Sequence, residues 1–236
     1  MRYLESFKGD LLGLYGEKRI VSLLFYGSQA FNRSQSRYSD YDFYLLLDSP
    51  KANDALVGRD FVQRLDSIDI TIQYLDLIEA RGWKNFQFGN HGIFFLLHLA
   101  SAITLHGTNI FQRKLTIIEP SKIRQSLFAQ IEEYFWRLNH WFLTIKDEEW
   151  LLSQYKKYII RIIEDILLLF GDISFAEINT LTYQEIICSF LATKGYFSSE
   201  TKKLAINSYA SNTELLQLNK LLHLLNYDYL KIYNNA

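Results

Sequence analysis

The chain has 236 residues, of which 49% are hydrophobic and 22% are charged, and its formal net charge is −1. This composition is typical of a globular protein with one large or two modest domains. The near-neutral charge argues against a nucleic-acid partner and an anionic membrane, because both attract basic proteins. The single cysteine, Cys188, excludes an internal disulfide and a cysteine-based zinc site. We expect Cys188 to be a small buried hydrophobic residue.

Membrane and targeting segments are not predicted. Residues 1–19 carry charges throughout and lack the apolar stretch of a signal peptide. The longest apolar window, residues 92–107, is too short and too interrupted by histidine to span a bilayer. We therefore expect a soluble, cytoplasmic protein.

The first third of the chain alternates between helical and strand patterns. Apolar residues at helical spacing predict helices, and β-branched or alternating runs predict strands. The expected order is helix 2–16, strand 20–27, a short helix, strand 42–48, helix 53–65 and strand 67–75. This order predicts an α+β fold, in which helices back a small mixed sheet.

Strand patterns fade after about residue 90. The helical segments expected there are 90–107, 119–150, 154–171, 182–195 and 213–233. Residues 114–119 fit either a last short strand or an extended link. We place a domain boundary near residue 118, with a catalytic domain over 1–117 and a helical bundle for substrate binding or accessory contacts over 118–236.

Two aspartates, Asp40 and Asp42, occupy alternate positions at the start of an apolar run, within the stretch "SDYDFYLLLD". Side chains at alternate strand positions point the same way, so the two carboxylates repel each other. Mg²⁺ removes this conflict, because it prefers oxygen ligands and leaves room for substrate phosphate and water. Asp69, on the polar face of the next strand, is the expected third carboxylate. Three carboxylates can hold two ions for phosphoryl chemistry.

A glycine–serine pair, Gly27 and Ser28, follows the first predicted strand. Glycine at a strand end lets the backbone approach a ligand closely. The amide groups of the short helix expected after it are suited to phosphate, and the Ser28 hydroxyl can add a hydrogen bond. This arrangement favours a nucleoside triphosphate as the ligand.

The stretch "FYGSQAFNRSQSRYSDYDFYLLLD" resembles the active-site motif of the polymerase-beta-like nucleotidyltransferase superfamily, in which Gly-Ser precedes Asp-x-Asp. Residues 100–111, "ASAITLHGTNIF", are also similar to a segment of small-molecule, antibiotic-type adenylyltransferases. The resemblance covers about residues 15–112. It implies that Asp40 and Asp42 bind magnesium and that Gly27 and Ser28 hold phosphates.

The resemblance also implies a third carboxylate. We prefer Asp69 to its neighbours Asp66 and Asp76, because Asp69 lies in mid-strand. A catalytic base is not singled out, and four glutamates are candidates: Glu79, Glu132, Glu133 and Glu164.

The function expected from this resemblance is transfer of a nucleoside monophosphate, AMP from ATP, to a hydroxyl of a small-molecule acceptor. Mg²⁺ would assist and pyrophosphate would leave, and the helical bundle would provide the acceptor pocket. One alternative is a protein AMP-transferase that modifies a partner protein, as antitoxin-like minimal nucleotidyltransferases do. Another is a catalytically silent nucleotide-binding module. The sequence leaves open whether the bundle serves its own chain or a second copy in a homodimer.

Overall fold

The computed structural model describes residues 2–31, 40–65, 67–82, 92–114, 119–170, 173–193, 195, 197–208 and 213–233. The chain separates into two compact units, Met1–Ile123 and Arg124–Ala236. Within the described residues, no helix combines the length and the apolar character needed to cross a membrane.

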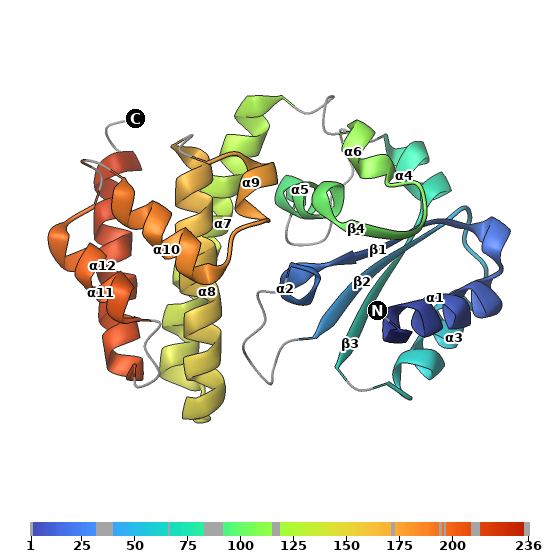
Figure 1. Ribbon diagram of the computed structural model, residues 1–236, viewed down its shortest axis with the longest axis horizontal. Helices are drawn as coiled ribbons and strands as arrows, with labels where there is room; N and C mark the ends of the chain where they lie inside the picture. The colour runs from blue at the N-terminus through green and yellow to red at the C-terminus, as the bar shows by residue number, and fades with distance from the viewer. Residues whose placement is uncertain are drawn as a thin grey trace. The chain divides into compact units, whose positions relative to one another are not determined.

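The first unit contains a four-stranded sheet (Figure 1). Its strands are β1 (Ile20–Tyr26), β2 (Tyr41–Leu47), β3 (Ile68–Tyr74) and β4 (Ile103–Gly107), arranged in the order β3-β2-β1-β4. Strand β1 runs antiparallel to both β2 and β4, whereas β2 and β3 are parallel. The sheet is therefore mixed, as the alternating sequence pattern predicts.

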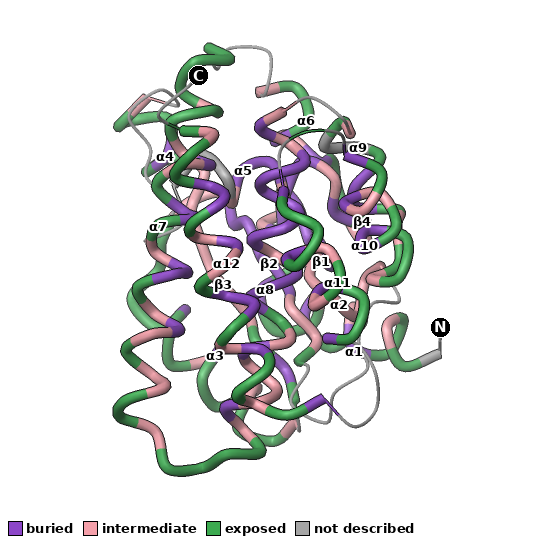
Figure 2. The backbone as a smooth tube through the Cα atoms, turned by 90° about the vertical axis from the view of Figure 1, so that its left-hand side faces the viewer, coloured by how far each residue is buried: buried purple, intermediate pink, exposed green. Residues whose placement is uncertain are grey.

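Helices cover both faces of this sheet, because residues on its strands alternate between two hydrophobic clusters. Leu24, Tyr44 and Leu46 pack on one face. The helices on that face are α4 (Leu75–Arg81), α5 (Gly92–Ser101) and α6 (Ile110–Lys114). Phe43 and Leu45 pack on the other face, against α1 (Arg2–Tyr15) and α3 (Asp54–Val62). The central strands β1 and β2 are accordingly buried for most of their length (Figure 2).

Arg19, at the end of the short 3₁₀ helix Glu17–Arg19, ties one end of the sheet to α3. Its guanidinium donates to both carboxylate oxygens of Asp54, at 3.0 and 2.9 Å, and to the Ser49 carbonyl at 2.7 Å. A further bond of 3.4 Å reaches Asp48. A paired geometry of this kind is the strong form of a charge-assisted hydrogen bond.

The second unit is helical. Its elements are α7 (Pro120–Thr144), which begins just before the unit does, then α8 (Glu148–Leu169), α9 (Phe175–Ile178), α10 (Tyr183–Ala192), α11 (Ser199–Asn207) and α12 (Leu215–Tyr233). Proline is the first residue of α7, where its missing N–H costs no hydrogen bond. Side chains of Asp147, Ser174, Thr182 and Ser198 cap the helices that follow them. These caps set the helix starts locally.

Three expectations from the sequence are wrong. The helix expected over 119–150 ends at Thr144, because Asp147 caps the next helix, so residues 148–150 belong to α8. The helix expected over 90–107 ends at Ser101, and Ile103–Gly107 instead forms β4, paired with β1. Cys188 is exposed rather than buried, because the buried face of α10 is formed by other side chains, Ile186, Ile187 and Phe190. Four short helices, α4, α6, α9 and α11, were not expected. The open choice over 114–119 falls largely on residues 115–118, which lie outside the described residues.

Candidate active site

Gly27 begins the four-residue helix α2 (Gly27–Ala30) directly after β1, with φ at +77°. A Cβ atom at this position would overlap Oδ2 of Asp42 and lie 2.9 Å from its Cγ. Both the positive φ and the contact therefore favour glycine. The Gly27–Ser28 turn and the Asp42 carboxylate, fifteen residues apart in the motif, meet at one point of the fold.

Asp42 and Asp69 face the same side of the sheet. Asp42 is the register partner of Tyr26 on β1 and of Asp69 on β3. Side chains at paired positions of neighbouring strands point to one face, and the strands are about 4.8 Å apart. Asp42 is half-buried and Asp69 is exposed. The two carboxylates therefore occupy the sheet face that α5 covers further along β2.

Asp40 lies immediately before β2 and is exposed. Among the described residues, no three or more His, Cys, Asp or Glu side chains gather closely enough to hold a metal ion. Asp40, Asp42 and Asp69 thus do not form a closed three-carboxylate site in this structure. Mg²⁺ is commonly held by only one or two carboxylates, with substrate phosphates and water as its other ligands. The oxygen donors at Asp42 and Asp69 fit that kind of site.

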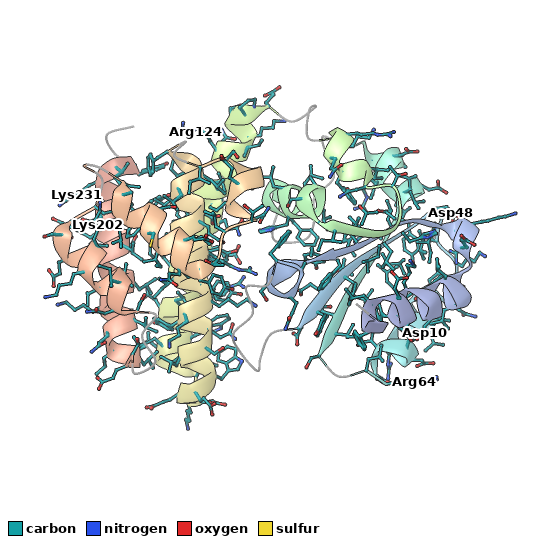
Figure 3. All side chains as sticks on the ribbon, viewed as in Figure 1. Asp10, Asp48, Arg64, Arg124, Lys202 and Lys231 are labelled. Carbon is teal, nitrogen blue, oxygen red and sulfur yellow. The ribbon has the colours of Figure 1, made fainter. Side chains whose placement is uncertain are left out.

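The other candidates for the third carboxylate differ in position. Asp66 lies outside the described residues. Asp76 follows β3, and its backbone N–H donates to the Asp48 carbonyl at the far end of β2. Six residues of extended strand separate Asp48 from Asp42, which is about 20 Å. Figure 3 shows Asp48 at the end of the sheet away from α2. Asp76 is therefore too distant to share an ion with Asp42.

Tyr26 is a neighbour of the carboxylates that the motif did not single out. As the register partner of Asp42, it presents its side chain on the same face. Its ring meets Phe95 of α5 edge-on, with 5.4 Å between the ring centroids. Phe95 also meets Tyr44, two residues beyond Asp42, with 6.0 Å between centroids. An aromatic layer thus borders the carboxylate face, and strand alternation alone would have placed Tyr26 there.

The four candidate glutamates have different surroundings. Glu79 is exposed on α4, and Glu132 is exposed on α7. Glu133 forms an ion pair with Arg137, one helical turn further along α7. Glu164 is buried on α8, with 7% of its surface exposed. None of these surroundings identifies a base, and the base stays unassigned.

Comparison with known proteins yields a structural relative but no sequence relative. No protein-family profile and no curated protein matches the chain. Its structure is similar to the crystal structure of spectinomycin adenyltransferase AAD(9) from Enterococcus faecialis with ATP and spectinomycin. The TM-score is 0.60 at 13% sequence identity, over 96% of this chain and 99% of the other. The chain therefore has the fold of a nucleotidyltransferase, and the fold class predicted from the sequence is confirmed.

Proposed function

We propose that this protein transfers AMP from ATP to a hydroxyl group of a small molecule and releases pyrophosphate. The observation that carries the proposal is the close approach of Gly27 to Asp42, with Asp69 in register on the next strand. The similar adenyltransferase was crystallised with ATP and with spectinomycin, a small-molecule acceptor. This fact supports the same two classes of substrate here. A cytoplasmic location fits the proposal, because ATP is available there.

The proposed roles follow from the chemistry of each side chain. Asp40, Asp42 and Asp69 would hold Mg²⁺ through carboxylate oxygens. Bound Mg²⁺ would supply neutralisation of the negative charge on the triphosphate. Gly27 and Ser28 would hold phosphate oxygens through a backbone N–H and a hydroxyl. Tyr26 makes no side-chain cap on α2, so it does not compete for the first amides of that helix.

The proposed reaction is an in-line displacement at the α-phosphorus. The acceptor oxygen forms a bond to the α-phosphorus, and the bond from that phosphorus to the pyrophosphate oxygen breaks. The hydroxyl proton passes to a base that remains unassigned. The protein's part is to fix both reactants and to stabilise charge, which is the main contribution of proteins to phosphoryl transfer.

A pyrophosphate-release assay tests this function. The protein is incubated with each nucleoside triphosphate, Mg²⁺ and a library of hydroxyl-bearing acceptors that includes spectinomycin. We expect release that depends on ATP and acceptor and that is lost in Asp42→Ala. Asp60→Ala is the matched control, because Asp60 is an exposed aspartate on α3. Unchanged activity in Asp42→Ala would exclude the proposed mechanism.

Labelled ATP distinguishes the acceptor classes. With the label on the α-phosphate, transfer to a soluble small molecule supports the proposal. Label that appears on a protein instead identifies a protein AMP-transferase. Nucleotide binding without release of pyrophosphate identifies a silent binding module.

A further inference from the structure

A cleft of about 470 Å³ lies in the first unit on the face of the sheet opposite Asp42. It is bordered by the edge strand β3 and by the helices α1 and α3, and Figure 1 shows both helices on one side of the sheet. Its volume falls within the range of small-molecule sites. Neither the proposed metal site nor the proposed phosphate site uses this face.

The floor of the cleft is apolar and incompletely covered. Ile70, Ile72 and Tyr74 line it from β3, and all three are only half-buried, although they belong to the hydrophobic cluster beneath α1 and α3. The cover is tight at Gly58 of α3, where a Cβ atom would lie 2.7 Å from the Ile72 Cδ1. Because the three β3 side chains stay half-exposed in spite of this contact, apolar surface remains open to a ligand.

Among the described residues that line the cleft, Arg59 is the one with a positive side chain. Arg59 of α3 borders the cleft and is exposed, and no described acidic residue forms an ion pair with it. Asp69 also borders the cleft, but strand alternation directs its carboxylate to the opposite face. Burial raises the pKa of Tyr15 to about 12, and burial also raises the pKa of Tyr74, so both lining phenols are neutral near pH 7.

We propose that this cleft binds a small molecule with an apolar body and one anionic group, such as an aliphatic carboxylate. The apolar body lies on Ile70 and Ile72, and the anion pairs with Arg59. The binding site stands without the proposed function.

Methyl NMR with selectively labelled isoleucine tests the binding. Octanoate is the probe, and octylammonium is its counterpart of opposite charge. We expect octanoate to shift the methyl signals of Ile70 and Ile72 but not those of Ile159, which is buried in the helical unit. Octylammonium should bind about fivefold more weakly, as expected for one partly exposed ion pair.

Two variants test the charge. Arg59→Gln should weaken octanoate about fivefold and abolish the preference over octylammonium. Arg64 is an exposed arginine just beyond α3 (Figure 3). Arg64→Gln should leave both the octanoate affinity and the preference over octylammonium unchanged. Equal binding of the two probes, or an unchanged octanoate affinity in Arg59→Gln, overturns the proposal. The proposal is also overturned if octanoate leaves the methyl signals of Ile70 and Ile72 unshifted. These readouts need no catalysis, so their failure is separate from failure of the proposed function.

Discussion

The carboxylate of Asp42 lies against the backbone of Gly27, leaving no room for even one methyl group between them. The contact joins the two halves of the sequence motif, since Gly27 directly follows β1 and Asp42 is the second residue of the neighbouring strand β2. Tyr26 and Asp42 are register partners, so the antiparallel pairing of β1 and β2 produces this contact. The requirement for glycine at position 27 is therefore a consequence of sheet geometry.

Gly27→Ala should remove most of the activity with little loss of stability. The new Cβ atom would displace the Asp42 carboxylate, and alanine is strained at a φ of +77° by about 1 kcal/mol. A displacement of about 1 Å at a reacting centre can cost about 100-fold in rate. The measurements are kcat/KM for AMP transfer and the melting temperature.

Gly13→Ala is the matched control for this substitution. Gly13 lies within α1, and a Cβ atom there would meet no atom within 4 Å. Alanine is favoured over glycine in a helix by about 1 kcal/mol, so this variant should keep full activity and gain some stability. Equal activity of the two variants would show that the Gly27–Asp42 contact plays no part in the reaction.

Asp69→Asn should lower kcat/KM for AMP transfer by about 100-fold, equal to ~2.7 kcal/mol of transition-state stabilisation. The reason is that Asp69 is in register with Asp42, so both carboxylates would bind the same ion. The concentration of Mg²⁺ needed for half-maximal rate should rise as well. Steady-state rates across a Mg²⁺ titration measure both effects.

Asp76→Asn is the comparison for Asp69. Asp76 belongs to the first turn of α4, beyond the opposite end of β3. We expect its Mg²⁺ dependence to match that of the unmodified protein. A loss in Asp76→Asn together with normal behaviour of Asp69→Asn would reverse the choice of the third carboxylate.

Local patterns predicted the strands that carry the motif, but not β4. Strands β1, β2 and β3 are seven-residue runs with clear apolar or alternating patterns. Strand β4 has only five residues and follows a strongly apolar helix, so its helical and strand patterns merge in the sequence. Its pairing with β1 is a long-range contact. A Cβ atom at Gly107 would overlap the Val21 carbonyl oxygen, a close approach that only the folded sheet reveals.

The candidate site was likewise predictable from the sequence only in part. The spacing of Gly27, Ser28, Asp40 and Asp42 could be read along one segment. The partnership of Asp42 with Asp69 depends on strand order and register, which tertiary pairing sets. The alternating pattern places Asp69 on the polar side of β3, but it does not predict which strand pairs with β3. The exclusion of Asp76 likewise needed the hydrogen bond that its N–H makes at the far end of the sheet.

Asp54→Asn should destabilise the first unit by about 3 kcal/mol, because it leaves the Arg19 guanidinium without its main partner. The hydrogen bonds from Arg19 are the largest cause that lowers the pKa of Asp54. A lowered folded pKa means that the stabilisation is present above the unfolded pKa of about 3.8. It is lost as the pH falls through the folded pKa. Urea unfolding of the variant and of the unmodified protein, at pH 7 and at pH 3, measures the difference in their free energies of unfolding.

Glu5→Gln is the control, because it removes an ion pair that should contribute little to the free energy of unfolding. Glu5 pairs with Lys8 on α1, and its side chain is 69% exposed. Its loss should change the free energy of unfolding by less than about 0.5 kcal/mol. A similar small effect for Asp54→Asn would show that Arg19 does not anchor the end of the sheet.

Asp165 should make the helical unit less stable as the pH rises. It is completely buried on α8, and no described residue forms a hydrogen bond with either carboxylate oxygen. Burial, and then the charge of Glu164, raise its pKa well above the usual range, against the opposing effect of Arg161. Tyr134 of α7 and Tyr229 of α12 also lie within electrostatic reach of Asp165. The folded protein therefore keeps a proton that the unfolded chain releases.

The sign follows from that proton. Because the folded state binds more protons, the free energy of unfolding falls by about 1.4 kcal/mol per pH unit between the unfolded pKa of about 3.8 and the raised folded pKa. Asp165→Asn should remove this slope, and Asp165→Leu should also raise stability at pH 8, because it buries no polar group. Unfolding in urea is followed from pH 5 to 9 by tryptophan fluorescence, since Trp136, Trp141 and Trp150 lie in the helical unit.

Glu214→Gln is the control, because Glu214 lies at an exposed position before α12. This variant should keep the pH slope of the unmodified protein. An unmodified protein whose stability does not fall over this range, or an Asp165→Asn variant that falls equally, would mean that Asp165 is not the group that holds the proton.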